Sequence, residues 1–284
     1  MNKNSIRGHD QFFLKLSLIS GLILIIFSWI FVSYETGYKF AELFNISTLS
    51  DIKNLFLKLV GENPRSSLSI KINEWYSLRS LAYETLLMSI LSIGIATILA
   101  LLTFILAAKN IHDGSIYGYP NIKLKCLYYI VRMTFSLTRA IPELILALII
   151  VLFFNPGIIA ASFALGIHNF GVLGKLFSES VENMDTQSIK SLQSAGSSKS
   201  QVMFYCVLPQ LLPQFTTYFL YRWEVIIRTT VVVGLVSASG LGKEFKLSFS
   251  YFHYEDLGLL LLWYIILVII VDLLCSSLRK LVRD

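Results

Sequence analysis

The chain has 284 residues, of which 55% are hydrophobic and only 15% are charged. Because an average soluble domain carries about 25% charged residues, this composition excludes an ordinary soluble protein and indicates one that lies in a lipid bilayer. The formal net charge of +6 is typical of the basic cytoplasmic loops of membrane proteins, so we expect no nucleic-acid partner.

Six apolar runs follow one another along the chain, each about long enough to cross a bilayer as a helix. The runs are 16–32, 81–108, 124–154, 158–177, 201–236 and 257–275. When the chain is threaded through them, every strongly basic flank falls on the same side of the membrane. The sequence therefore predicts an all-α, polytopic protein of the cytoplasmic (inner) membrane, with six transmembrane helices and both termini in the cytoplasm.

The region 1–80 is expected to hold the first transmembrane helix and an outer loop. Its basic start also fits a secretory signal peptide, but the apolar run is longer than the usual signal core and no small-x-small cleavage site follows it. We therefore expect an uncleaved helix. Within the loop, apolar residues recur at a spacing that predicts an amphipathic helix. These residues are Ile46, Leu49, Ile52, Phe56 and Leu59.

Prolines are expected to break two of the runs. Pro142 lies inside the third run, and a proline within a helix removes a hydrogen bond and favours a kink or break just before it. We expect residues 142–154 to be the embedded part of this run, with Arg132 near the inner interface. Pro209 and Pro213 are expected to interrupt the fifth run.

The chain carries no sequence signature of an enzyme. A phosphate-binding loop needs GxxxxGK followed by Ser or Thr, and the nearest approach, SASGLGKE at 237–244, lacks the first glycine and the final hydroxyl. HExxH and GxSxG are absent, the histidines are scattered, and Cys126, Cys206 and Cys275 have no CxxC spacing. We expect no catalytic residue, no metal and no cofactor, and free, buried thiols.

Charged residues lie roughly in the middle of the fifth run. A charge at membrane depth costs about 2.5–3.5 kcal/mol on insertion scales, so Arg222, Glu224 and Arg228 must face a partner, the bundle interior or water. Glu224 and Arg228 are four residues apart on one helical face and are able to pair, whereas Arg222 points elsewhere and is left unmatched. One interpretation is an ion pair with a snorkelling arginine. The other is a cationic path for an anionic solute, including Arg139, because the guanidinium fork binds two oxygens of an oxyanion.

A polar segment of about twenty residues separates the fourth and fifth runs. Ile189, Leu192 and Ala195 recur at helical spacing before Pro209, which predicts a short helix parallel to the membrane. Gly196 is expected to allow close approach to another surface.

This segment resembles the motif of ABC importer permease subunits, which reads Glu-Ala-Ala, three residues, Gly, nine residues, Ile-x-Leu-Pro. Gly196, the nine residues 197–205, and Leu208-Pro209 match its spacing, with Cys206 in place of isoleucine. The front half departs from the motif, because Lys190 stands at the acidic position and Ser191 at the first alanine.

Further stretches look like the phosphonate-permease branch of these importers, and together they cover roughly residues 80–275. The stretches are 138–148, 171–185, 208–230 and 233–242. The resemblance implies that residues 81–284 form the transmembrane domain of a type I ABC importer. It implies that two permease copies form the pore, with separate ATPase subunits and an extracytoplasmic phosphonate- or phosphite-binding protein as partners.

The resemblance also implies a coupling helix near 186–201 that docks into each ATPase. The residues expected to couple are Lys190, Ser191, Gly196, Lys199, Leu208 and Pro209. Ser239, Gly240 and Gly242 in the small-residue segment SASGLG are candidates for an outer gate, although a simple packing turn explains them equally well. An ABC permease for another small solute, such as an amino acid, remains an alternative. An ion-coupled secondary transporter is a weaker one, because no internal repeat is found.

Overall fold

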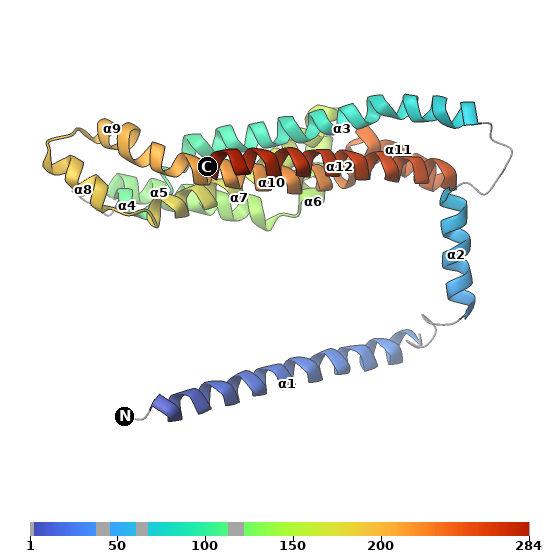
Figure 1. The fold of residues 1–284 in the computed structure, drawn as a ribbon, viewed down its shortest axis with the longest axis horizontal. Helices are drawn as coiled ribbons and strands as arrows, with labels where there is room; N and C mark the ends of the chain where they lie inside the picture. Colours follow the sequence, from blue (N-terminus) through green and yellow to red (C-terminus); the bar gives the residue numbers. More distant parts are fainter. Residues whose placement is uncertain (1–2, 38–45, 61–67, 113–121, 284) are drawn as a thin grey trace. The chain divides into compact units, whose positions relative to one another are not determined.

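The computed structural model describes residues 3–37, 46–60, 68–112 and 122–283 (Figure 1). These residues are almost entirely helical and contain no strand. The chain divides into two compact units, Met1–Glu62 and Asn63–Asp284. The boundary that the sequence places at residue 80 falls inside a continuous helix. Parts of the expected outer loop, at 38–45 and 61–67, lie outside the described residues.

The smaller unit consists of α1 (Lys3–Thr36) and α2 (Ile46–Val60). Residues 13–35 of α1 are apolar on all sides and none of them is buried within the protein, which is the pattern of a helix surrounded by lipid. The helix α2 is the amphipathic helix that the apolar spacing predicts, and Lys58 in its last turn complements the helix dipole.

The larger unit is a bundle in which α3, α7, α10 and α12 run side by side (Figure 1). Its elements are α3 (Leu68–Thr103), α4 (Lys109–His112), α5 (Ile122–Ala140), α6 (Glu143–Phe153), α7 (Ile158–Glu182), α8 (Gln187–Ser194), α9 (Lys199–Val202), a π-helical turn (Met203–Val207), α10 (Leu208–Ser237), α11 (Gly240–Ser250) and α12 (Tyr254–Arg283). The long helix α10 lies at the centre, because it contacts α3, α6, α7, α11 and α12.

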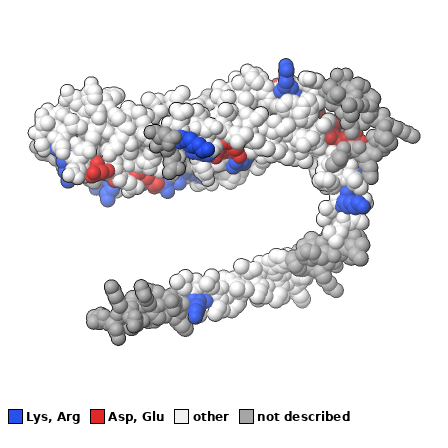
Figure 2. Space-filling model, viewed as in Figure 1, with Lys and Arg blue, Asp and Glu red and all other residues white. Residues whose placement is uncertain are grey.

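The described helices provide up to six membrane spans. Four single helices, α1, α3, α7 and α12, are long and apolar enough to cross a bilayer. Two bent pairs complete the set if each counts as one span: α5 with α6, bent by 97°, and the helix leading through α10 with α11, bent by 58°. This agrees with the six runs that the sequence predicts. Most of the face drawn in Figure 2 carries neither acidic nor basic side chains.

The expected break at Pro142 is confirmed, whereas the expected interruption at Pro209 and Pro213 is wrong. The helix α5 ends at Ala140 and Pro142 is the N-cap of α6. In contrast, α10 is continuous from Leu208. Pro209 sits in its first turn, where the fixed φ of proline is compatible with the helix. The π-helical turn just before it provides a wider entry into the helix.

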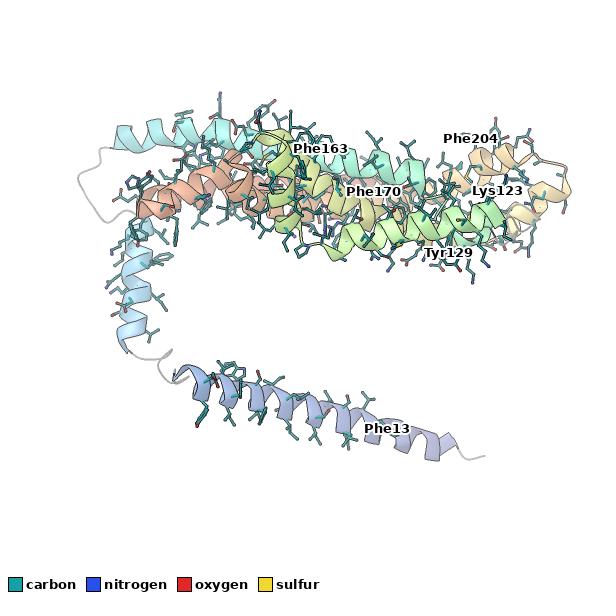
Figure 3. All side chains as sticks on the ribbon, turned by 180° about the vertical axis from the view of Figure 1, so that it is seen from behind. Phe13, Lys123, Tyr129, Phe163, Phe170 and Phe204 are labelled. Atoms are coloured by element: carbon teal, nitrogen blue, oxygen red, sulfur yellow. The ribbon has the colours of Figure 1, made fainter. Side chains whose placement is uncertain are left out.

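Small residues and aromatic rings fill the core of the bundle. The helix α7 buries a stripe of alanine and glycine against its neighbours, which lets helix backbones approach closely. At one end of the core, three aromatic rings form a cluster with centroids 4.2–6.3 Å apart: Phe104 from the turn after α3, Phe177 from α7 and Phe215 from α10. Other aromatic side chains, such as Tyr129 and Phe204, point away from the bundle (Figure 3).

Two ion pairs join α10 to α12. Arg279 Nη2 lies 2.7 Å from Glu224 Oε1, an ion pair without hydrogen-bond geometry at that oxygen. Arg228 Nη2 contacts both carboxylate oxygens of Asp272, at 2.8 and 3.0 Å. The expected pair of Glu224 with Arg228 is therefore wrong. Glu224 and Arg228 do share one face of α10. That face packs against α12, where their partners Arg279 and Asp272 lie two turns apart.

These ion pairs also correct the depth of the charges. Arg279 lies one turn from the end of α12, so its partner Glu224 is level with the end of the α12 span, not with its middle. The reason is that α10 begins well beyond the end of α12, and about fifteen of its residues precede Glu224.

The connection from α10 to α11 is a tightly packed turn. Ala238 and Gly240 both adopt left-handed backbone conformations, with φ of 53° and 60°. The first N–H groups of α11 donate to α3, from Gly240 to Glu84 at 3.1 Å and from Leu241 to Thr85 at 2.9 Å. These two acceptors satisfy donors that a helix N-terminus leaves free.

Gly242 is expected to tolerate no side chain, because a Cβ there would lie 2.6–2.7 Å from the backbone of Gly234 in α10. Gly242→Ala should destabilise the protein by about 1–3 kcal/mol through overpacking, measured as a lower thermal midpoint of the purified protein. Gly94→Ala is the matched control, because a Cβ at Gly94 on α3 meets nothing within 4 Å. Equal midpoints for the two variants would contradict the packing of this turn.

The Glu224–Arg279 pair is expected to show energetic coupling. Glu224→Gln and Arg279→Gln should each lower the thermal midpoint, because each leaves a charge without its partner in a poorly solvated place. The double variant should be less destabilised than the sum of the singles, by about 0.5–3 kcal/mol. Arg79→Gln, at an exposed arginine of α3, is the control, and strictly additive effects would argue against the pair.

Candidate sites for coupling and for the solute path

The polar segment between α7 and α10 folds into a short hairpin of α8 and α9 at one end of the bundle (Figure 1). The helix α8 ends in a Schellman motif, because Ser197 N donates to Leu192 O and Gly196 N donates to Gln193 O. Ser198 then caps α9 in a capping box with Gln201. The Schellman motif ends α8 and the capping box begins α9, so the hairpin has a defined shape.

Gly196 is explained by its backbone conformation. Its φ is +82°, in the left-handed region that glycine adopts at low cost. A Cβ there would meet nothing within 4 Å of this chain. Close approach to the rest of the chain is therefore not what requires this glycine, and the open space leaves room for another surface.

The predicted coupling residues are mostly exposed on this hairpin. Lys190, Ser191, Gly196 and Lys199 are exposed, and Ile189 is the buried side chain that anchors α8. The other two predicted residues begin α10, where Leu208 is half-buried and Pro209 is exposed. The hairpin thus presents a polar, basic surface, and Ile189 of α8 and Val202 of α9 anchor it.

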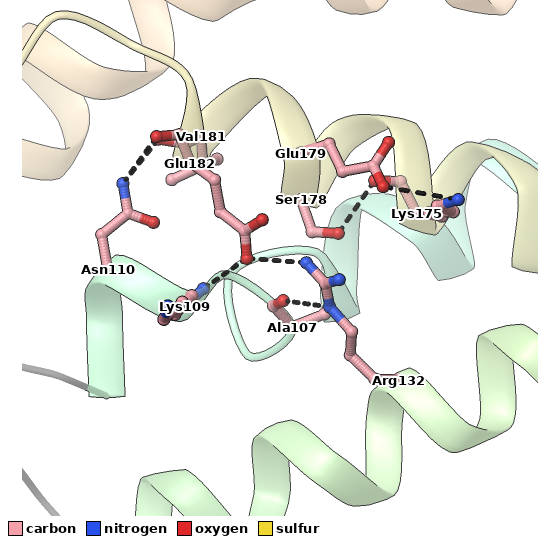
Figure 4. A network of polar contacts seen from close by, with 9 residues as sticks. All are labelled: Ala107, Lys109, Asn110, Arg132, Lys175, Ser178, Glu179, Val181 and Glu182. Carbon is pink, nitrogen blue, oxygen red and sulfur yellow. Dashed lines mark hydrogen bonds and ion pairs between the residues drawn. The ribbon is translucent and has the colours of Figure 1, made fainter. Parts of the chain in front are cut away.

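A polar network ties the end of α7, from which the hairpin starts, to α4, to α5 and to the turn that follows α3 (Figure 4). Glu182, at the end of α7, accepts a hydrogen bond from Lys109 N at 2.7 Å and pairs with Arg132 at 2.6 Å. Arg132 also donates to Ala107 O at 3.1 Å. Asn110 donates to Val181 O at 2.8 Å. A displacement of the hairpin would therefore act on three helices at once.

Arg222 faces α7. Its Nε donates to Asn169 Oδ1 at 2.9 Å, and its Nη2 donates to the same oxygen. Asn169 is fully buried, and its amide nitrogen donates to Leu165 O at 2.7 Å. Arg222 is thus held by an uncharged partner, where the sequence predicts an unmatched cation.

Further polar groups gather at the break between α5 and α6. His168 Nδ1 lies 3.1 Å from Ile141 O, and His168 Nε2 lies 3.5 Å from Glu143 Oε1. Glu143 also acts electrostatically on Arg222. Arg139, in the last turn of α5, donates to Phe135 O of its own helix. The break, α7 and α10 therefore enclose a region that carries both signs of charge.

The predicted site residues fall into four separate groups. The coupling residues lie on the hairpin and at the start of α10, Arg222 and Arg139 lie beside α7, Glu224 and Arg228 face α12, and the gate candidates lie at the turn between α10 and α11. The gate candidates Ser239, Gly240 and Gly242 are buried against α3, where the Ser239 hydroxyl contacts Met88 Sδ at 3.0 Å.

Sequence reasoning missed three polar residues of the solute region, Glu143, His168 and Asn169. The signal was present, since each is a polar residue within or beside an apolar run, but nothing in the sequence indicates which face it occupies. The expectation of buried thiols fails at Cys126, which is exposed on α5. Among the described residues no cluster of His, Cys, Asp or Glu has the composition of a metal site.

Comparisons with known proteins identify the family. The profile of the binding-protein-dependent transport system inner membrane component matches residues 114–283. The chain is 33% identical over 198 residues to the phosphite transport system permease protein PtxC of Stutzerimonas stutzeri, covering 69% of this chain and 68% of the relative. It is 30% identical over 207 residues to the phosphate-import permease protein PhnE of Mycolicibacterium smegmatis, covering 72% of this chain and 36% of that longer protein.

Solved structures agree on the fold. A chain of the MetNI methionine ABC transporter, in inward-facing conformations, superposes with a TM-score of 0.63 at 18% identity, covering 76% of this chain and 99% of that one. A chain of an amino acid ABC transporter gives a TM-score of 0.61 at 16% identity, covering 76% and 98%. The architecture is that of a type I ABC importer transmembrane domain. The chain therefore belongs to the family of binding-protein-dependent transport system inner membrane components, and it is a non-catalytic, multi-pass permease subunit that works with ATPase subunits and a solute-binding protein.

Proposed function

We propose that this permease carries phosphonate or a related phosphorus oxyanion such as phosphite. The observation that carries the proposal is Arg222, a half-buried cation whose partner is a neutral amide, so that its charge is left for an anion. The printed functions of the relatives, phosphite transport and phosphate import, supply the same solute class. An arginine fork suits a tetrahedral oxyanion because it offers parallel N–H donors to two oxygens.

We assign the inner part of the solute path to Arg222 and Arg139. Neither has a carboxylate within ion-pair distance among the described residues. Glu224 and Arg228, which the sequence places in the same path, are engaged with α12 and are proposed to hold that helix in place.

We assign the opposite end of α10 to the outer gate, at Ser239, Gly240 and Gly242. The support is that this turn is buried and hydrogen-bonded to α3, so that it moves only if α3 moves. Closing the pathway there needs no further group.

The α8–α9 hairpin is proposed to dock into the ATPase subunit, with both termini of the chain in the cytoplasm and a second copy of the permease completing the pore. Lys190 is exposed at the position where the family motif carries an acid. We therefore expect the ATPase surface to offer an acidic residue opposite Lys190, or to lack the basic one.

Neutralising Arg222 is expected to reduce solute uptake. In proteoliposomes that hold the full importer, Arg222→Gln should lower phosphite uptake on the order of tenfold or more, the loss expected for one charge-assisted interaction, while basal ATPase activity is retained. Arg79→Gln, which removes the same charge at an exposed position of α3, should leave uptake unchanged. Wild-type uptake by the Arg222 variant would remove this residue from the solute path, and uptake of methionine in place of phosphite would reassign the solute.

Substitutions on the hairpin are expected to uncouple transport from ATP hydrolysis. Gly196→Glu strains a left-handed position and adds an acid to the exposed surface, and Lys190→Glu reverses the local charge. Both should lower the ATPase stimulation caused by the loaded binding protein. The charge-matched control is Lys246→Glu on α11, which is exposed and far along the chain from the hairpin. Full stimulation in the Gly196 variant would disprove the docking site.

A further inference from the structure

We propose that Asn169 is the positioning residue that makes Arg222 selective for an anion. It fixes the guanidinium in place through a neutral oxygen and so leaves the positive charge to be balanced by the solute. This inference rests on the proposed oxyanion transport.

The orientation of the Asn169 amide is determined by its neighbours. The amide nitrogen donates to Leu165 O at 2.7 Å, one turn earlier in α7. The amide oxygen must then face α10, where it accepts from Arg222 Nε at 2.9 Å and from Nη2. The reverse orientation would place an amide N–H₂ against guanidinium donors and leave both sides without an acceptor.

Asn169 occupies only one edge of the guanidinium. An arginine has five N–H donors, and Asn169 takes one on Nε and one on Nη2. No described residue accepts from the three remaining donors, two of which lie on the Nη1–Nη2 edge. That edge has the parallel geometry that binds two oxygens of a phosphorus oxyanion.

A neutral partner distinguishes Arg222 from the other arginines that bridge helices in the described part of the chain. Arg132 contacts Glu182, Arg228 contacts Asp272 and Arg279 contacts Glu224, each a carboxylate within 3 Å. Glu143 is a carboxylate that acts electrostatically on Arg222, but it lies more than 4.0 Å away and forms no ion pair with it. Glu143 Oε1 lies 3.5 Å from His168 Nε2 instead.

An aspartate at position 169 would differ from asparagine by one atom. It would keep an oxygen toward Arg222, but it would neutralise the guanidinium by a direct ion pair. The solute would then meet a neutral ion pair in place of a cation, and the carboxylate beside its site would repel it.

The test uses the complete importer in proteoliposomes, with the binding protein loaded with phosphite at saturating concentration. The measured quantities are phosphite taken up per ATP hydrolysed, and the thermal midpoint of the purified complex. Asn169→Asp should lower the uptake per ATP on the order of tenfold or more. It loses the hydrogen bond to Leu165 O but gains an ion pair with Arg222, so its midpoint should stay above that of Asn169→Leu. Asn169→Leu, which keeps the branched shape but removes all three hydrogen bonds, should lower uptake and should lower the midpoint more.

The outcomes separate this inference from the proposed function. Wild-type uptake by Asn169→Asp, together with a loss in Arg222→Gln, would overturn the role of Asn169 and leave the solute path intact. Wild-type uptake in both variants would overturn the two together. Reduced uptake by Asn169→Asp with a midpoint as low as that of Asn169→Leu would make Asn169 a packing residue, and would also overturn the inference.

Discussion

The compensation of charge along α10 is the constraint on which the larger unit depends. Three successive positions of this helix point to three neighbours: Arg222 to Asn169 of α7, Trp223 to Ser89 of α3, and Glu224 to Arg279 of α12. The side chains of consecutive residues in a helix point in directions about 100° apart. Residues 222–224 therefore determine that α7, α3 and α12 lie on different sides of α10. A polar group in a poorly hydrated bundle needs a partner, and these partners order the packing of α3, α7 and α12.

The same helix connects the two candidate sites. The hairpin leads into α10 at Leu208, and Arg222 lies roughly 21 Å further along the helix at 1.5 Å per residue. Because Pro209 and Pro213 do not interrupt α10, a displacement of the hairpin reaches Arg222 through a single continuous helix. The network of Glu182 with Arg132 and Lys109 acts in parallel, since it links the end of α7, where the hairpin begins, to α4 and α5.

Much of the fold follows from the sequence, because span length and proline position are local properties. The apolar runs predict the spans, Pro142 predicts the break between α5 and α6, and apolar spacing predicts α2. The ion pairs of α10 were not predictable in this way. Glu224 and Arg228 have the spacing of an intrahelical pair, but their partners Asp272 and Arg279 are adjacent only once α12 has packed against α10. The left-handed conformation of Gly196 was not predictable either, since a positive φ is invisible in a spacing pattern; its close approach to another surface stays a prediction.

The neutral partner of Arg222 is informative because a carboxylate would serve stability better. A charge buried without a partner is costly, and at three other arginines the chain supplies a carboxylate within 3 Å. At Arg222 it uses asparagine, which orients the guanidinium but leaves its charge in place. Binding energy is most useful for transport when the solute supplies the missing counter-charge on arrival and removes it on leaving. A permanent ion pair at Arg222 would stabilise the empty permease more than the loaded one. An anion moving past α10 would then bind less well beside Arg222.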